Sequence, residues 1–201
     1  MARRSSPLRV RLTRLRFPIH GPRVDLVLPS SRHVPALVRL MEEPSVARGS
    51  LHIPYPYSVR DALAWVRATA RDRRRGEALG LAIVRRANGE LLGGALLHQF
   101  HEGSRRAEVG YWLGRKHRGQ GYATEATRLL MSVGFDRLGL HRIEARIFPR
   151  NTASLRVVRR CGFRYEGRLR DEVQKDGRWR TTLLFARLAS DAPPRHTARR
   201  K

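Results

Sequence analysis

The chain has 201 residues, 41% of them hydrophobic, which is enough for one domain with its own core. Lys and Arg number 42 against 17 Asp and Glu, so the formal net charge is +25. A single cysteine, Cys161, excludes an internal disulfide, and no apolar run approaches the length of a membrane span. The basic N-terminus lacks the apolar segment of a secretory signal, so we expect a cytoplasmic protein that does not engage a membrane.

The excess of arginine leaves two explanations open. The charge can serve binding to nucleic acid or the ribosome, because Lys and Arg displace counterions from phosphate. It can also reflect arginine-rich codon usage, since the arginines occur in nearly every segment and no zinc-ligand spacing or aromatic RNA-binding strand accompanies them. A general affinity for polyanions follows in either case. The spacing of His98, His101 and His117 is not that of metal ligands, so we expect no metal site.

The sequence predicts one domain with a basic tail at each end and a strand near its start. Residues 1–9 and 189–201 are basic tails with little to bury, so we expect both to be mobile and to flank one domain over residues 10–188. Alternating apolar and Arg residues predict a strand over residues 8–17, which residues 25–28 continue or pair with.

Two helices are predicted next. Apolar residues at i, i+3, i+4 and i+7 predict a helix that Ser31 can cap and that Pro44 ends. Residues 45–57 are predicted to form an ordered loop. Ser58 then begins a helix that reaches about Arg75, with Asp61 completing a capping box.

The rest of the chain is dominated by strands. We predict them over residues 79–84, 91–99, 108–113, 142–148, 163–169 and 182–186, with helices over residues 124–138 and 153–160. Ala87-Asn88-Gly89 is a strong hairpin turn between the first two of these strands. Clustered antiparallel strands with helices at the crossovers indicate an α+β fold, with a mixed and mostly antiparallel sheet flanked by helices.

The most informative stretch is the turn between the predicted strand over residues 108–113 and the helix that follows it. The turn reads Arg118-Gly119-Gln120-Gly121-Tyr122-Ala123, and Arg115 lies just before it. Glycines allow a ligand to approach the backbone, and a helix N-terminus presents free N–H groups and partial positive charge. A strand, a glycine turn and a helix N-terminus together predict a phosphate site. The turn lacks the Gly-Lys-Ser/Thr of a P-loop and the third glycine of a dinucleotide fingerprint.

Four ordered blocks carry a resemblance to a known family. They are the Arg-x-x-Gly-x-Ala turn, residues 108–113, the pattern Asn-x2-Ser-x7-Gly-Phe-x2-Glu-Gly from Asn151, and residues 175–179. Over roughly residues 10–188 the chain resembles the GNAT N-acetyltransferases, and within them the RimJ/RimL-type branch that acts on ribosomal-protein N-termini. The resemblance implies a splayed strand pair that takes acetyl-CoA as cosubstrate. It also implies that the Leu113 backbone binds the pantetheine, that residues 118–123 cradle the pyrophosphate, and that Asn151 bonds the coenzyme or orders its loop.

Glu108 and Ser154 are the candidate catalytic residues. A partly buried carboxylate can act as a base near neutral pH, and the matching Glu of the branch is linked to amine deprotonation. The alternative is a structural pair of Glu108 with Arg105 or Arg106. Many GNAT enzymes carry a Tyr where this chain has Val158, so Ser154, one helical turn earlier, is the candidate proton donor to the leaving thiolate. The alternatives are a serine that only caps or bonds the helix, and protonation by solvent.

The acceptor amine is left open by the sequence. Thr181 stands where the branch often has an acid, which bears on how the amine is held. A protein N-terminal α-amine is the favoured acceptor. A small-molecule amine, such as an amino acid or antibiotic, is one alternative, and a non-catalytic basic protein that binds ribosomes or nucleic acid is the other. The protein is expected to be a monomer or a homodimer.

Overall fold

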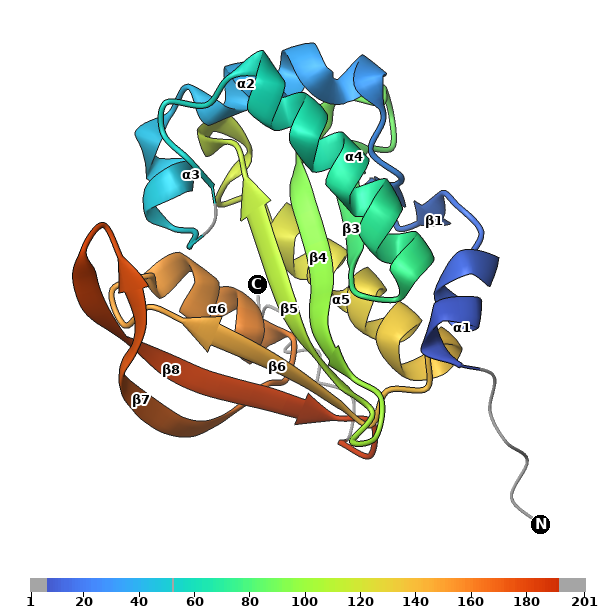
Figure 1. The fold of residues 1–201 in the computed structure, drawn as a ribbon, viewed down its shortest axis with the longest axis vertical. Coiled ribbons are helices and arrows are strands. Elements are labelled where there is room, and N and C mark those ends of the chain that lie inside the picture. The colour runs from blue at the N-terminus through green and yellow to red at the C-terminus, as the bar shows by residue number, and fades with distance from the viewer. Residues whose placement is uncertain (1–6, 52, 192–201) are drawn as a thin grey trace, which may run out of the picture.

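The computed structural model describes residues 7–51 and 53–191 and contains one mixed sheet covered by helices on both faces (Figure 1). The helices are α1 (Leu8–Arg14), α2 (Val34–Met41), α3 (Pro44–Arg48), α4 (Val59–Arg75), α5 (Tyr122–Ser132) and α6 (Thr152–Arg160). The strands are β1 (Ile19–His20), β2 (Val24–Val27), β3 (Leu79–Arg85), β4 (Leu91–His101), β5 (Arg106–Leu113), β6 (Arg142–Ile147), β7 (Arg164–Lys175) and β8 (Arg178–Leu188). The predicted α+β class is confirmed.

The sheet order is β1-β2-β3-β4-β5-β6-β8-β7, and every neighbouring pair is antiparallel except β5 and β6. Helices α2 and α4 lie on one face over β3 and β4, while α5 and α6 lie behind the sheet (Figure 1). The larger core cluster joins the sheet to α1, α5 and α6, and a smaller one packs α2 and α4 against β3 and β4. Among the described residues, no helix packs along the face of β6, β7 and β8 on the α2 side, and α3 approaches only the β7–β8 hairpin, through Lys175.

The first predicted strand is wrong. Residues 8–14 form helix α1, which packs on α4. Leu8 and Leu12 are both buried, and a spacing of four satisfies a helix as well as a strand. Glu102 accepts the Leu8 N–H at 2.9 Å, and Arg73 donates to the Leu12 carbonyl at 3.2 Å. The domain therefore begins before residue 10, and the rest of the predicted tails, residues 1–6 and 192–201, lies outside the described residues.

Other boundaries shift for local reasons. Pro44 does not end α2 but begins α3, where its missing N–H costs nothing, so the predicted loop over residues 45–57 starts with a helical turn. Before α2, a 3₁₀ turn covers Ser31–His33 and is capped by Ser30. The predicted capping box of Ser58 and Asp61 is confirmed at the start of α4. Strands β7 and β8 are longer than predicted, and helix α5 gives way to a π-helical turn over Val133–Arg137.

Candidate active site

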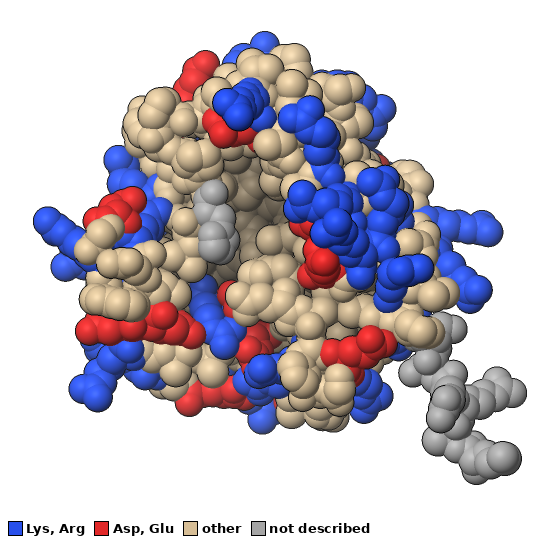
Figure 2. Space-filling model, viewed as in Figure 1, with Lys and Arg blue, Asp and Glu red and all other residues tan. Residues whose placement is uncertain are grey.

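Strands β5 and β6 separate after a short parallel ladder. The ladder pairs Arg106 with Arg142, Ala107 with Ile143 and Glu108 with Glu144, and it stops there although β5 continues to Leu113. Backbone groups along the two diverging edges are thus free of a strand partner, which is where an extended ligand can add. The space-filling view shows a hollow between α3 and this end of β5 (Figure 2). The predicted splayed strand pair is present.

The glycine turn leads from β5 into α5 as predicted. Gly119 and Gly121 have φ of 78° and 86°, a region that side chains with a Cβ rarely adopt. A Cβ on Gly119 would meet nothing within 4 Å, so the backbone faces open space there. Gly121 is the N-cap of α5 and supplies no side-chain acceptor, which leaves the first-turn N–H groups available. This arrangement fits a phosphate group.

Two arginines that the sequence did not indicate hold the turn, one just before β2 and one at the end of β3. Arg23 donates to the Gln120 carbonyl at 3.0 Å and pairs with Glu125 of α5 at 3.0 Å. Arg85 donates to the Tyr122 hydroxyl at 2.5 Å. The Tyr122 side chain is therefore buried under the turn, so of this residue only the backbone remains available to a ligand of the predicted phosphate site. An acidic residue in the first turn of α5 was the one sequence signal for such a pair.

Arg118 lies beside the gap rather than free in solvent. Its Nε donates to the Leu113 carbonyl at 3.0 Å, and its Nη1 donates to Ser45 Oγ of α3 at 2.9 Å. On the other side of the gap, Lys175 of β7 donates to the Ala47 carbonyl at 2.6 Å. Helix α3 is thus tied to both the glycine turn and the β7–β8 hairpin, and it borders the groove that the strands open.

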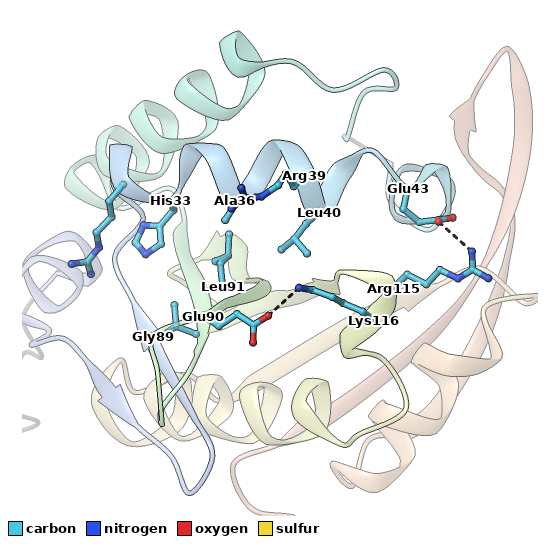
Figure 3. Close-up of a pocket in the computed structure, with 12 residues that line it drawn as sticks. His33, Ala36, Arg39, Leu40, Glu43, Gly89, Glu90, Leu91, Arg115 and Lys116 are labelled. Atoms are coloured by element: carbon cyan, nitrogen blue, oxygen red, sulfur yellow. Dashed lines mark hydrogen bonds and ion pairs between the residues drawn. The ribbon is translucent and has the colours of Figure 1, made fainter.

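Arg115 points away from the glycine turn. It pairs with Glu43 at 3.3 Å and, with Lys116 and Glu90, forms the rim of a cavity of about 980 Å³ between α2 and the β3–β4 hairpin (Figure 3). The floor of this cavity is apolar and includes Leu40 and Leu91. Neither the predicted catalytic residues nor the glycines of the turn line it, so it is separate from the gap between β5 and β6.

Glu108 projects from β5 onto the sheet face that carries α2 and α4. Its neighbours in the strand, Ala107 and Val109, point into the main core. Burial raises the pKa of Glu108, and the nearby Arg146 opposes that shift without cancelling it. The distance between Glu108 Oε2 and Arg146 Nη1 is 2.5 Å. A carboxylic acid whose pKa lies above its ordinary value is suited to exchange protons near neutral pH.

Arg146 is the centre of a carboxylate cluster, which we define as Glu108, Glu144 and Glu172. Glu144 lies 3.1 Å and Glu172 lies 2.8 Å from the guanidinium. The alternative pairing of Glu108 with Arg105 or Arg106 is not found, because Arg106 pairs with Glu144 at 3.4 Å. The partner of Glu108 thus comes from β6, at a position that sequence spacing did not indicate.

The N-terminal turn of α6 faces the gap from the other side. Asn151 caps this helix, since its Oδ1 accepts the Ser154 N–H at 3.1 Å. Tyr111 of β5 donates its hydroxyl to the Ser154 carbonyl at 3.3 Å, which brings a second proton donor next to Ser154. Burial raises the pKa of Tyr111, so its hydroxyl stays protonated. Val158 is fully buried in the core and does not share the exposure of Ser154.

The remaining candidates have structural surroundings. Cys161 is buried, and burial raises the pKa of its thiol to about 11. Among the described residues, no group of three His, Cys, Asp or Glu is placed to hold a metal ion. No helix within residues 7–51 and 53–191 is long and apolar enough to cross a membrane.

Comparison with known proteins identifies a family and several relatives that match part of this chain. Residues 23–164 match the family model described as an acetyltransferase (GNAT) domain. The N-acetyltransferase p20 of Bacillus licheniformis, itself uncharacterised, is 37% identical over 113 residues, which cover 56% of this chain and 64% of p20. Spermidine N(1)-acetyltransferase of Escherichia coli is 30% identical over 96 residues, 48% of this chain and 52% of that protein. The chain thus spans about half to two thirds of these relatives' length.

Solved structures of two acetyltransferases have a fold similar to that of this chain. RimJ of Mycobacterium smegmatis, in complex with a coenzyme A disulfide, superposes with a TM-score of 0.76 at 28% identity, covering 84% of this chain and 86% of RimJ. RimL, described as the ribosomal L7/L12 α-N-protein acetyltransferase in complex with coenzyme A, gives a TM-score of 0.78 at 25% identity, covering 86% of this chain and 98% of RimL.

Proposed function

The chain belongs to the GNAT acetyltransferase family, and on that basis we propose that it transfers the acetyl group of acetyl-CoA to a protein N-terminal α-amine. The observation that carries the proposal is the open gap between β5 and β6, with the glycine turn of α5 at one end and Glu108 on its acceptor side. The likeness to RimJ and RimL supports the α-amine as acceptor.

The coenzyme would lie in this gap. The first-turn N–H groups of α5 and the backbone of residues 119–123 would hold its pyrophosphate, with Arg118 at the side. The pantetheine arm would run along the free edge of β5 near Leu113, like an added strand. Asn151, as the cap of α6, orders the turn that faces the arm rather than reaching toward it.

Residues on both sides of the gap would then take part in the reaction. Glu108 takes a proton from the ammonium group of the acceptor, directly or through water, which frees the nitrogen lone pair. The amine attacks the thioester carbonyl, the C–N bond forms and the C–S bond breaks. A backbone N–H near Leu113 stabilises the oxyanion. As the amide forms, the nitrogen loses its second proton and the thiolate gains one. Ser154 would donate to the sulfur and be reprotonated from the nitrogen through water, with exchange of both protons with solvent as the alternative.

A small polyamine is the second candidate acceptor, and one observation favours it. The carboxylate cluster brings Glu108 and Glu172 to the guanidinium of Arg146, while Glu144 is buried and pairs with three arginines, so Glu108 and Glu172 are the acceptors that an ammonium group of a polyamine would meet. The similarity to a spermidine acetyltransferase is in line with this.

A screen of acetyl-CoA consumption distinguishes these functions. Peptides with free α-amines are compared with the same peptides blocked at the N-terminus and with spermidine. Turnover of free peptides alone supports the proposal, and turnover of spermidine alone overturns the choice of acceptor. Glu108→Gln should lower the rate by about 10²-fold or more while coenzyme binding stays near the wild-type value. Coenzyme binding without turnover on any amine would favour a binding protein with this fold.

A further inference from the structure

The solvent face of α4 carries a row of arginines, which we call the α4 arginine stripe: Arg67, Arg71, Arg74 and Arg75. All four are exposed, and their spacing of i, i+4, i+7 and i+8 places them on one side of the helix. Arg9 of α1 lies at the end of the row, because a Cβ added to Gly76 would come 3.1 Å from its Cβ. Figure 2 shows Lys and Arg side chains gathered over the part of the surface where α4 lies, beside the central hollow.

The fold does not neutralise the stripe. Arg71 pairs with Asp72 at 2.9 Å, but no hydrogen bond or ion pair of Arg67, Arg74 or Arg75 is found among the described residues. Arg73, by contrast, turns toward α1 and donates to the Leu12 carbonyl. Like charges one helical turn apart destabilise a helix, so the stripe works against the element that carries it. Helix α4 is held instead by its capping box and by packing of its inner face.

We propose that the α4 arginine stripe binds the phosphodiester backbone of nucleic acid. Guanidinium groups are the side chains best suited to bidentate contact with phosphate. Residues 67 to 75 span about 12 Å of helix, and a duplex presents a negative charge about every 1.7 Å along its axis. Several phosphates therefore lie within reach of the row at once.

An anionic membrane fits the stripe less well. A helix that lies on a membrane buries an exposed apolar face between or beside its basic residues. Trp65 and Val66, which pack against the smaller core cluster, lie on the other side of α4 from the stripe, and Leu63, one turn before Arg67, is partly buried against the same cluster. No large hydrophobic side chain is exposed between Arg67 and Arg75 in the described structure. A row of arginines with no exposed large apolar side chain between them matches a phosphate backbone better than it matches a membrane surface.

Binding is measured on the full chain, so both basic termini are the same in every variant. The stripe variant carries Arg67→Gln, Arg74→Gln and Arg75→Gln. The matched control carries Arg156→Gln, Arg159→Gln and Arg160→Gln on α6, which are also exposed and change the charge equally. A third variant replaces the three stripe residues with Lys. Fluorescence anisotropy follows a labelled RNA hairpin, a DNA duplex of the same sequence and anionic lipid vesicles, between about 50 and 200 mM salt.

The stripe variant should lose about tenfold or more in nucleic-acid affinity, and the slope of log K against log salt should fall by about one for each arginine removed. The α6 control and the Lys variant should keep most of the binding. Comparing RNA with DNA tells which backbone is preferred. The proposal is overturned if the α6 control loses as much as the stripe variant, because the affinity then follows net charge alone. It is also overturned if vesicles, and not nucleic acid, lose binding. Circular dichroism should show all variants folded, because the capping box and the packing of the inner face hold α4 and are unchanged in each variant.

Discussion

The charge of Arg146 is expected to set the pH at which Glu108 becomes an active base. Glu108 accepts a proton only when ionised, so the rate rises as pH passes upward through its pKa. Burial raises that pKa and Arg146 holds it down, so replacing Arg146 with Gln should raise the pKa further. The acidic limb of the kcat/KM profile should then move to higher pH.

The size of the effect follows from the geometry. Arg146 Nη1 lies 2.5 Å from Glu108 Oε2, with side chains 25% and 13% exposed. Opposite charges about 4 Å apart attract by about 4 kcal/mol at an effective dielectric of about 20. The guanidinium is shared with Glu144 and Glu172, so we assign about a third to a half of this to Glu108. That is roughly ten- to thirtyfold in proton affinity, and a limb about one pH unit or more higher.

The assay is the pH dependence of kcat/KM for wild type, Arg146→Gln and Arg146→Lys with one peptide acceptor. Lys keeps the charge but not the fork, so its limb should lie between the other two. Arg71→Gln makes the same charge change at an exposed pair on α4 and should leave the limb in place. A limb that does not move in Arg146→Gln, while Glu108→Gln still removes activity, would refute the idea that this pair governs the base.

Three other outcomes are expected. Gly121→Val places a β-branched residue at φ 86° in the glycine turn, so coenzyme A affinity by calorimetry should fall by about tenfold or more, and an unchanged affinity would place the phosphate site elsewhere. Ser154→Ala should slow the chemical step in single-turnover kinetics with Tyr111→Phe as the companion variant; if only Tyr111→Phe slows it, the tyrosine hydroxyl is the donor. Asn151→Ala removes the α6 cap and should cost about 1 kcal/mol of stability, read as a lower urea midpoint, and an unaltered midpoint would show that the cap contributes nothing.

The sequence was sufficient to predict the features that depend only on residues close together in the chain. The capping box of Ser58 and Asp61 and the turn at Asn88-Gly89 depend on neighbours in sequence, and both were predicted. The glycine turn into α5 was predicted for the same reason. Residues 8–14 were not, because Leu8 and Leu12 fit both periods and the packing of α1 on α4 decided between them.

The candidate site also combines residues that the sequence indicated with contacts that only the fold creates. The sequence indicated Glu108, but its partner Arg146 is 38 residues away and meets it only because β5 and β6 pair at this point. The Arg23 and Glu125 pair, 102 residues apart, is likewise a product of the fold. Val158 lies one turn from Ser154 on α6, as expected, but is buried in the core, while Tyr111 brings a hydroxyl to the α6 turn from β5.

The distribution of charge gives the groove its polarity. In a chain with 42 basic and 17 acidic residues, the three carboxylates of the cluster meet at Arg146 on the floor of the acceptor side. At the glycine turn, at the other end of β5, Arg118 bonds to no carboxylate of the described residues, whereas Arg23 and Arg85 pair with Glu125 and Glu90. In the proposed function, the anionic coenzyme would bind at the glycine-turn end of β5 and the cationic amine at the Glu108 end, and the two would meet where β5 and β6 part. High salt should weaken capture of both, and binding of the coenzyme should lose more, because several full charges act on its phosphates.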